Sequence, residues 1–187
     1  MATKPVAVGV LALQGDFAEH LVALRKLKIP SLEVRTVEEI KKTAGLIIPG
    51  GESTTIGKLL HSTGLDLWLQ QHVKTGYAVY GTCAGAILLA QLDLIDIQVK
   101  RNAYGRQLDS FDEPIQSKTF PKLRGVFIRA PIFTAIGKNV TVLATHNKQP
   151  VLVQQGKILA GSFHPELTDN LAVHRYFTKL ATAQTYH

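Results

Sequence analysis

The sequence has one cysteine in 187 residues, and this scarcity excludes several classes of protein. One cysteine cannot form an internal disulfide, so a disulfide-stapled secreted domain and a four-thiolate zinc site are both ruled out. The length suits a single domain over residues 1–187, with a core large enough to need no such staple. We therefore expect a reduced, cytosolic (cytoplasmic) globular protein.

Long apolar runs, internal repeats and low-complexity segments are also lacking. The first apolar run, residues 6–13, is too short for a bilayer and has no small-residue cleavage site. Hydrophobic residues make up 45% of the chain, with 15 glycines and 8 prolines, so disorder and a fibrous repeat are excluded. We expect no membrane segment, no export signal and no membrane partner.

Acidic residues are fewer than basic ones, since 14 Asp and Glu stand against 21 Lys and Arg, a formal charge of +7. The basic residues are scattered in pairs such as Lys41/Lys42 and Lys100/Arg101, without interleaved aromatic side chains. A nucleic-acid surface normally has a basic run or stripe. We therefore expect no nucleic-acid partner, and the charge indicates a solvated face or an acidic partner.

Short apolar runs alternate with helical patterns in the first half of the chain. The expected strands are 6–13, 32–37, 46–48 and 77–80, and the expected helices are 17–27, 55–61 and 65–74. Asp16 and Glu19 have the spacing of a capping pair at the start of the first helix. This alternation predicts an α/β fold with a parallel sheet, right-handed crossovers and helices on both faces.

The second half of the chain changes to short strands. These are expected at 95–100, 125–129, 140–144, 151–155 and 157–161, as antiparallel strands and a hairpin added to the core. The turn Gln155-Gly156-Lys157 supports the hairpin. A terminal helix from 170 to about 183 closes the chain.

The single cysteine lies in the segment GTCAG, residues 81–85, between an apolar strand and the apolar helical segment 86–90. Strand, sharp turn and helix form a nucleophile elbow, in which the two flanking glycines allow a strained turn and close packing. The turn lifts the Cys83 thiol to the carboxyl end of the sheet, where the positive end of the helix favours a thiolate. A lone cysteine is more often structural, but the glycines favour catalysis.

A nucleophilic thiol needs a base, and the base needs a group that orients it. The segment SFHPEL, residues 162–167, supplies both. Pro165 favours an extended His164, and in extended chain residues i and i+2 project to the same side, so we expect Glu166 beside His164. Glu166 would accept the imidazole N–H and stabilise the imidazolium. The other histidines are assigned to surface or packing roles or carry no spacing signal: His20, His61, His72, His146, His174 and His187.

The segment PGGESTT, residues 49–55, follows an expected strand. Its two glycines let backbone N–H groups turn toward an acceptor, and Ser53 or Thr54 can cap the next helix. Such a loop can bind phosphate, but the Walker and GxGxxG patterns are missing. We interpret it as part of an oxyanion hole, with one N–H from Gly51 and the other from Ala84, because acyl transfer from a thiol builds an oxyanion.

GTCAG and FHPE together resemble the class I glutamine amidotransferases, whose Cys, His and Glu release ammonia from glutamine. The blocks GVLALQGDFAEH, PGGESTT, RNAYGRQLDSF, FIRAP and SFHPELT run from residue 9 to residue 168. Together they resemble the glutaminase subunits of pyridoxal 5′-phosphate synthase. Two alternatives remain: another class I glutaminase subunit, or a cysteine hydrolase on a related α/β sandwich. A binding module that keeps the fold without the activity is a further rival.

The resemblance implies a three-layer α/β/α sandwich, class I glutamine amidotransferase-like, with a mainly parallel central sheet, added antiparallel strands and a catalytic triad of Cys83, His164 and Glu166. It places Gln14 near the oxyanion loop and the partner interface. It implies no flavin, metal or nucleotide cofactor. It maps the contacts with the substrate glutamine onto Gly51, Glu52, Ser53, Arg101, Ile128 and Arg129.

The resemblance also implies a reaction. Cys83 would attack the side-chain amide of glutamine, and water would hydrolyse the glutamyl thioester to glutamate. The ammonia would pass to a separate synthase subunit, a (β/α)8 barrel that makes pyridoxal 5′-phosphate, and activity would be low until that subunit docks. A physical reading of these mapped residues agrees in part, since Arg101 or Arg129 can hold the glutamine carboxylate and Glu52 can receive its ammonium group.

Overall fold

The centre of the molecule is a seven-stranded sheet, which a computed structural model describes within residues 7–101 and 110–183. In order across the sheet, the strands are β2 (Ser31–Val34), β1 (Ala7–Leu11), β3 (Thr43–Ile48), β4 (Ala78–Thr82), β11 (Ile158–Gly161), β10 (Gln149–Gln155) and β9 (Thr141–His146). The first five run parallel, whereas β10 pairs antiparallel with both β11 and β9. The predicted mainly parallel sheet with added antiparallel strands is confirmed.

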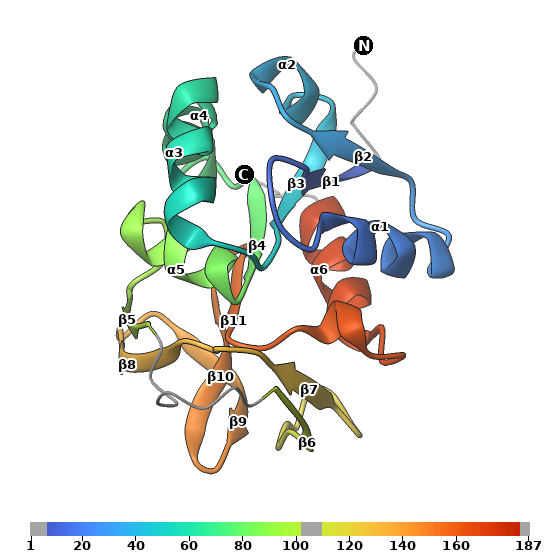
Figure 1. The fold of residues 1–187 in the computed structure, drawn as a ribbon, viewed down its shortest axis with the longest axis vertical. Helices are drawn as coiled ribbons and strands as arrows, with labels where there is room; N and C mark the ends of the chain where they lie inside the picture. The colour runs from blue at the N-terminus through green and yellow to red at the C-terminus, as the bar shows by residue number, and fades with distance from the viewer. Residues whose placement is uncertain (1–6, 102–109, 184–187) are drawn as a thin grey trace.

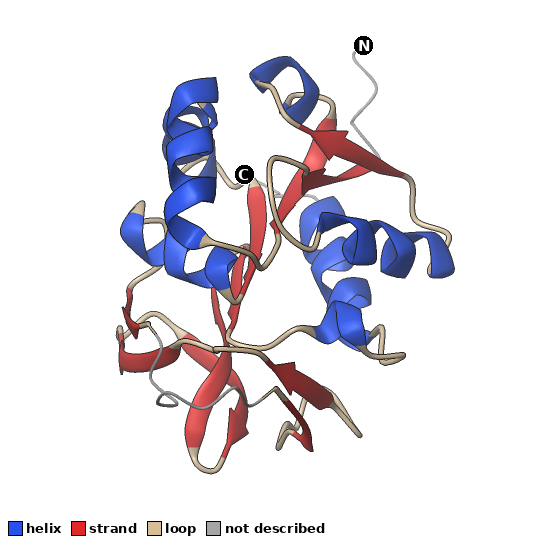
Figure 2. Ribbon diagram, in the orientation of Figure 1, coloured by secondary structure: helices blue, strands red, loops and turns tan. Residues whose placement is uncertain are grey.

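Helices cover both faces of the sheet and complete three layers (Figures 1 and 2). One face carries α3 (Ser53–Thr63), α4 (Leu65–Val73) and α5 (Ala84–Gln91), and the other carries α1 (Phe17–Lys26) and α6 (Ala172–Thr182). Because side chains alternate along a strand, Leu46 and Ile48 of β3 pack into one core and Ile47 into the other. The predicted α/β/α sandwich is confirmed. Within the described ranges, no helix is long and apolar enough to cross a membrane.

Four strands lie outside the central sheet in two antiparallel pairs. They are β5 (Ile97–Lys100) with β8 (Ile132–Ile136), and β6 (Phe111–Pro114) with β7 (Arg124–Phe127). The strands predicted at 95–100 and 125–129 are therefore present as antiparallel strands, and they lie in these two small pairs outside the central sheet. The strands β6 and β8 have no predicted counterpart; β6 exposes three of its four residues, so it lacks the alternation that marks a strand.

The expected strand 32–37 is also too long, because a short helix, α2 (Val37–Ile40), begins at its end. Thr36 Oγ1 accepts the Glu39 N–H at 3.3 Å, and Glu39 Oε2 accepts the Thr36 N–H at 3.0 Å. This capping box satisfies two otherwise unpaired N–H donors. The capping box therefore stops the extended chain after β2 and starts the helix. The apolar Val37 belongs to this helix and not to the strand.

The functional residues gather at one edge of the sheet. β1, β3, β4 and β11 are parallel neighbours, so the loops that follow their carboxyl ends meet there. These loops carry Gln14 to Asp16, the two glycines after Pro49, Cys83 and His164. The carboxyl edge is where open α/β sheets bind ligands.

Candidate active site

Cys83 stands between β4 and α5 in a backbone conformation that few non-glycine residues adopt, with φ 48° and ψ −103°. A Cβ on Gly85 would lie 2.1 Å from the Ile48 carbonyl oxygen, and one on Gly81 would lie 2.5 Å from the Gly85 carbonyl carbon. The two glycines are therefore needed for helix α5 to approach β3 and β4. The predicted strand, turn and helix around the cysteine are confirmed. The thiol Sγ lies 3.8 Å from the Ile128 carbonyl oxygen, to which it donates.

His164 follows β11, and its Nδ1 is 2.8 Å from Glu166 Oε1, with both side chains buried. Glu166 does not reach this position through extended chain, as the sequence suggested. A 3₁₀ turn, η1 (Pro165–Leu167), begins directly after His164 and folds the carboxylate back toward the imidazole. Proline suits the first position of such a turn because its fixed φ and missing N–H match it. The predicted pairing is present, but its local geometry was predicted wrongly.

The partners of His164 decide its charge. Burial disfavours the imidazolium, but hydrogen bonds with Cys83 and Glu166, and the charges of both, outweigh it and raise the pKa of His164 to about 10. Burial raises the pKa of Glu166, and the hydrogen bond from His164 acts in the opposite direction. A protonated His164 beside the Glu166 carboxylate is therefore favoured, and it can deliver a proton to a leaving group.

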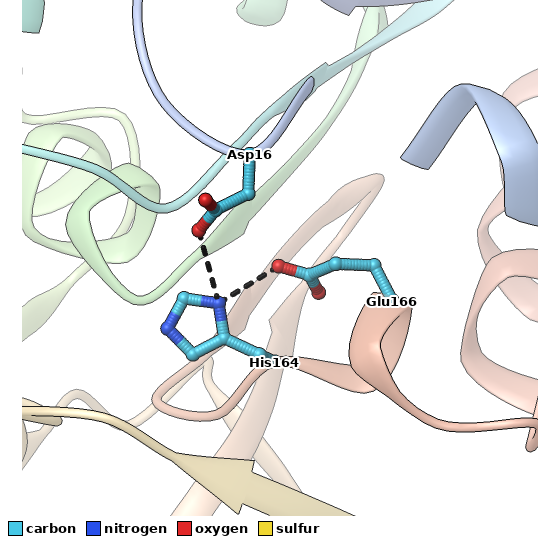
Figure 3. A group of neighbouring side chains, drawn as sticks. All are labelled: Asp16, His164 and Glu166. Carbon is cyan, nitrogen blue, oxygen red and sulfur yellow. Dashed lines mark hydrogen bonds and ion pairs between the residues drawn. The ribbon is translucent and has the colours of Figure 1, made fainter. Parts of the chain in front are cut away.

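A second carboxylate faces the same imidazole nitrogen: Asp16 Oδ2 lies 3.6 Å from His164 Nδ1 (Figure 3). The expected capping pair of Asp16 with Glu19 is absent, because Asp16 begins α1 without a side-chain capping hydrogen bond. Asp16, His164 and Glu166 offer ligand atoms within 4.8 Å of one another, a spacing that can hold a metal ion. However, a 2.8 Å contact of Nδ1 with Oε1 is typical of an N–H donating to a carboxylate.

The loop after β3 is fixed by the loop after β1. Gln14 Oε1 accepts the Glu52 N–H at 2.9 Å, and the Asp16 N–H donates to the Gly50 carbonyl at 3.1 Å. Gly51 has φ 151°, in the region that favours glycine. The side chain of Gln14 therefore controls the backbone of the loop that the sequence predicts to donate an oxyanion N–H.

Helix α3 is capped by Glu52 rather than by Ser53 or Thr54, as the sequence suggested. Glu52 Oε1 accepts the Thr54 N–H at 3.0 Å, and Oε2 accepts the N–H and Oγ1–H of Thr55 at 2.8 and 2.7 Å. The hydrogen bond from the Thr55 hydroxyl, and those from the two N–H groups, lower the pKa of Glu52 to about 2. The carboxylate stays ionised at the rim of the site.

These groups line one cavity of about 490 Å³, a size typical of small-molecule sites. The lining residues are Gln14, Asp16, Gly51, Glu52, Ser53, Cys83, Ala84, Ile87, Arg101, Ile128, Arg129 and His164. Every sequence-predicted site residue is among them except Glu166, which is buried beside His164. Arg101 Nη1 donates to Thr54 Oγ1 at 3.4 Å. Residues 102–109 of the RNAYGRQLDSF block lie outside the described residues.

Sequence reasoning missed the buried polar groups near Glu166. His20 and His174, expected in surface or packing roles, are hydrogen-bonded to each other and fully buried. A signal was available: His20 precedes the buried Leu24 by four residues, and His174 precedes the buried Phe177 by three. These spacings place both histidines on core-facing sides of their helices.

Comparisons with known proteins show the family of this chain. The sequence model of the SNO glutamine amidotransferase family matches residues 10–182. The chain belongs to this family. The pyridoxal 5′-phosphate synthase subunit PdxT from a strain of Thermus thermophilus is 51% identical over 185 residues, covering 93% of this chain and 97% of the relative. The subunit PdxT from Pseudothermotoga lettingae is 49% identical over 187 residues, covering 94% and 96%.

Solved structures show the same family fold. A crystal structure described as a glutamine amidotransferase is 49% identical, with a TM-score of 0.91 over 94% of this chain and 99% of that chain. The PurLQS structure from Thermotoga maritima is 16% identical, with a TM-score of 0.71 over 94% of this chain and 98% of that chain. The second likeness establishes the fold alone.

Proposed function

We propose that this member of the SNO glutamine amidotransferase family hydrolyses glutamine at Cys83, as the glutaminase subunit of pyridoxal 5′-phosphate synthase. The observation that carries the proposal is the nucleophile elbow of Cys83, which lines the same cavity as His164, together with the 2.8 Å contact of His164 Nδ1 with Glu166 Oε1. The close PdxT relatives support the assignment to vitamin B6 biosynthesis. The reaction needs no bound cofactor, and its setting would be the cytoplasm.

The charged groups at the rim of the cavity suit the two charges of an amino acid. Arg101 and Arg129 offer guanidinium groups for the glutamine α-carboxylate, and Glu52 offers an ionised carboxylate for the α-ammonium. Ile128 and Ser53 complete the contacts beside Cys83. Held at both charged groups, glutamine would extend its side-chain amide toward the thiol.

In the first step, the Cys83 sulfur attacks the amide carbon, and the carbonyl oxygen takes up the electron pair as an oxyanion. Backbone N–H groups of Gly51 and Ala84 stabilise this oxyanion. The intermediate collapses, the carbon–nitrogen bond breaks, and ammonia leaves with a proton from His164. A glutamyl thioester remains on Cys83.

In the second step, water attacks the thioester carbonyl carbon. His164 takes a proton from the water, and Glu166 stabilises the imidazolium that forms. The carbon–sulfur bond breaks, glutamate leaves, and the sulfur regains its place beside His164. Because Gln14 holds the backbone at Glu52, a partner that contacts Gln14 can set the orientation of the neighbouring Gly51 N–H.

The partner in this proposal is the synthase subunit, a (β/α)8-barrel chain that receives the ammonia. We expect slow glutamate release from the isolated chain and a marked increase on addition of that subunit. Cys83→Ala should abolish glutamate release while it still allows the subunits to associate. Equal rates with and without the synthase subunit would contradict activation, and full activity of Cys83→Ala would contradict the proposed nucleophile.

A further inference from the structure

A line of buried polar side chains continues from Glu166 into the layer of α1 and α6. His174 Nε2 on α6 lies 2.9 Å from His20 Nδ1 on α1. On its other side, His20 Nε2 lies 3.2 Å from Thr82 Oγ1 and 3.5 Å from Glu166 Oε1. None of these side chains lines the cavity, so none can touch the substrate.

The two histidines are neutral at physiological pH. Burial, followed by the charges of His174 and His164, lowers the pKa of His20 well below its ordinary value. Burial lowers the pKa of His174 to about 4. A neutral imidazole donates from one nitrogen and accepts at the other. Each ring therefore has a definite tautomer that its neighbours determine.

The tautomers of His20 and His174 can be assigned from the position of the Glu166 carboxylate. His20 Nε2 faces both Thr82 Oγ1 at 3.2 Å and Glu166 Oε1 at 3.5 Å, and a hydrogen on this nitrogen is favoured by the negative charge of Glu166, so we assign His20 as a donor from Nε2 and an acceptor at Nδ1. His174 must then donate from Nε2 to His20 Nδ1. This leaves His174 Nδ1 without a hydrogen, and that atom has no hydrogen-bond partner within the described part of the chain. All the N–H donors of the line therefore point toward Glu166.

We propose that His20 and His174 are positioning residues that hold the Glu166 carboxylate toward His164, a role that rests on the proposed glutaminase function. A buried carboxylate is stable only if donors satisfy it. Glu166 Oε2 has no partner among the described residues, so Oε1 carries the contacts with both His164 and His20. His174 contributes by fixing the tautomer of His20.

A packing role alone would not require imidazole side chains at positions 20 and 174. Apolar side chains could occupy the same core-facing positions next to Leu24 and Phe177, and they would avoid the cost of burying imidazoles. Besides His164 and His20, the titratable groups that face Glu166 are Asp16 and Tyr80. Burial and the charge of Glu166 raise the pKa of Tyr80, so its hydroxyl stays neutral.

The test compares variants of the full chain, each assembled with the synthase subunit. His20→Leu removes the donor, and His20→Gln keeps an N–H in a side chain of similar reach. His146→Leu is the matched control, because His146 is also buried and bonded to a carboxylate, that of Glu113, but lies outside the line. The readouts are kcat, KM for glutamine, and the pH profile of kcat from about pH 5 to about pH 9.

We expect His20→Leu to lower kcat by about 10-fold to 100-fold, the usual effect of losing a hydrogen bond to a charged group, with KM changed less than about twofold. The acid limb should move to higher pH, because a carboxylate that loses a donor binds a proton more readily. His20→Gln should recover part of kcat, and His146→Leu should match the wild type. An unchanged acid limb in His20→Leu, or no recovery in His20→Gln, would overturn the proposal.

A double-mutant cycle with Glu166→Gln tests whether the effect passes through Glu166. In that background, His20→Leu should change kcat by less than about twofold, and a full additional loss would overturn the proposal. Cys83→Ala distinguishes a failure of the proposed glutaminase function from a failure of the positioning role. Residual activity in Cys83→Ala overturns the proposed function together with this role, whereas its inactivity beside a fully active His20→Leu overturns only the positioning role.

The tautomers can be measured on the wild-type chain, so the proposal does not depend on the folding of any variant. Nitrogen-15 NMR of the imidazoles distinguishes the two neutral tautomers and the charged ring. We expect His20 and His174 to be neutral and protonated on Nε2 around pH 7. A hydrogen on Nδ1 of His20, or a charged His174, would overturn the proposal.

Discussion

Cys83 combines a strained backbone with the side chain that we propose as the nucleophile. A non-glycine residue at φ 48° and ψ −103° costs conformational energy, and such residues persist where the surrounding structure holds them. Here the Cys83 N–H donates to the Gly161 carbonyl at 2.8 Å, and the Cys83 carbonyl accepts the Ile87 N–H at 3.3 Å. These bonds hold the turn in the conformation that presents the thiol to His164.

Replacing the triad carboxylate tests how much the charge of His164 matters. Glu166→Gln keeps the shape of the side chain but removes the negative charge that raises the pKa of His164. We expect kcat to fall roughly 100-fold or more, because the amide cannot stabilise the imidazolium, while KM changes little. The pKa of His164, followed by NMR, should drop from about 10 toward its ordinary value. An unchanged titration would show that Glu166 does not set that charge.

The buried histidines also predict a dependence of stability on pH. Burial lowers the pKa of His174 from 6.5 to about 4, so between these values the unfolded chain holds a proton that the folded chain does not. Acidification therefore favours unfolding, and this one group lowers the free energy of unfolding by about 1.4 kcal/mol per pH unit.

Chemical denaturation at several pH values checks this prediction. In His174→Phe, the free energy of unfolding should decline less steeply than in the wild type as the pH falls from 6.5 toward 4. Above pH 6.5, the difference between the two proteins should be constant. If the free energy of unfolding declined with pH at the same slope in both proteins over the acidic range, the lowered pKa of His174 would be contradicted.

At the scale of elements, close approach between α5 and the sheet places the nucleophile. We expect Gly85→Ala to lower the free energy of unfolding by about 3 kcal/mol and to abolish activity, because its Cβ would lie 2.1 Å from a backbone oxygen that no rotamer change can move. Gly57→Ala in α3 is the control, since its Cβ would meet only a Leu88 methyl at 3.2 Å. Thermal unfolding and glutamate release measure both effects, and equal behaviour of the two variants would contradict this packing argument.

The elements around the nucleophile were predictable because their local signals agree with their tertiary surroundings. The apolar run before Cys83 and the glycines beside it mark the strand, turn and helix by sequence alone. The strand β6 was missed because its segment FDEP exposes three of its four residues and lacks an apolar alternation. Its partner and its place in the fold depend on contacts with β7, which no local pattern encodes.

The same limit applies to the candidate site. The residues proposed for the triad, the oxyanion loop and the substrate contacts were named from motifs and from the family resemblance, and these residues meet at one edge of the sheet. The approach of Asp16 to His164 was not predicted, because the pairing of Asp16 with Glu19 offered a local explanation for it. His20 and His174 are 154 residues apart in the chain, so their hydrogen bond is a consequence of the completed fold.

At the scale of the whole molecule, the chain brings the proposed nucleophile and base, two arginines and an ionised carboxylate to one cavity, from loops that follow different strands. The chain belongs to the SNO glutamine amidotransferase family over residues 10–182 and has PdxT relatives at about half identity. The scattered +7 charge remains without a structural assignment. The central claim of the proposed function is therefore that a glutamyl group is bound covalently to Cys83 during turnover.

Acid quenching during turnover tests that claim most directly. The chain, assembled with the synthase subunit, is mixed with isotopically labelled glutamine, quenched in acid, digested and mapped by mass spectrometry. The account predicts a labelled glutamyl group on the peptide that contains Cys83, and its absence in Cys83→Ala. Glutamate release with the label on another residue, or from Cys83→Ala at the wild-type rate, would contradict it.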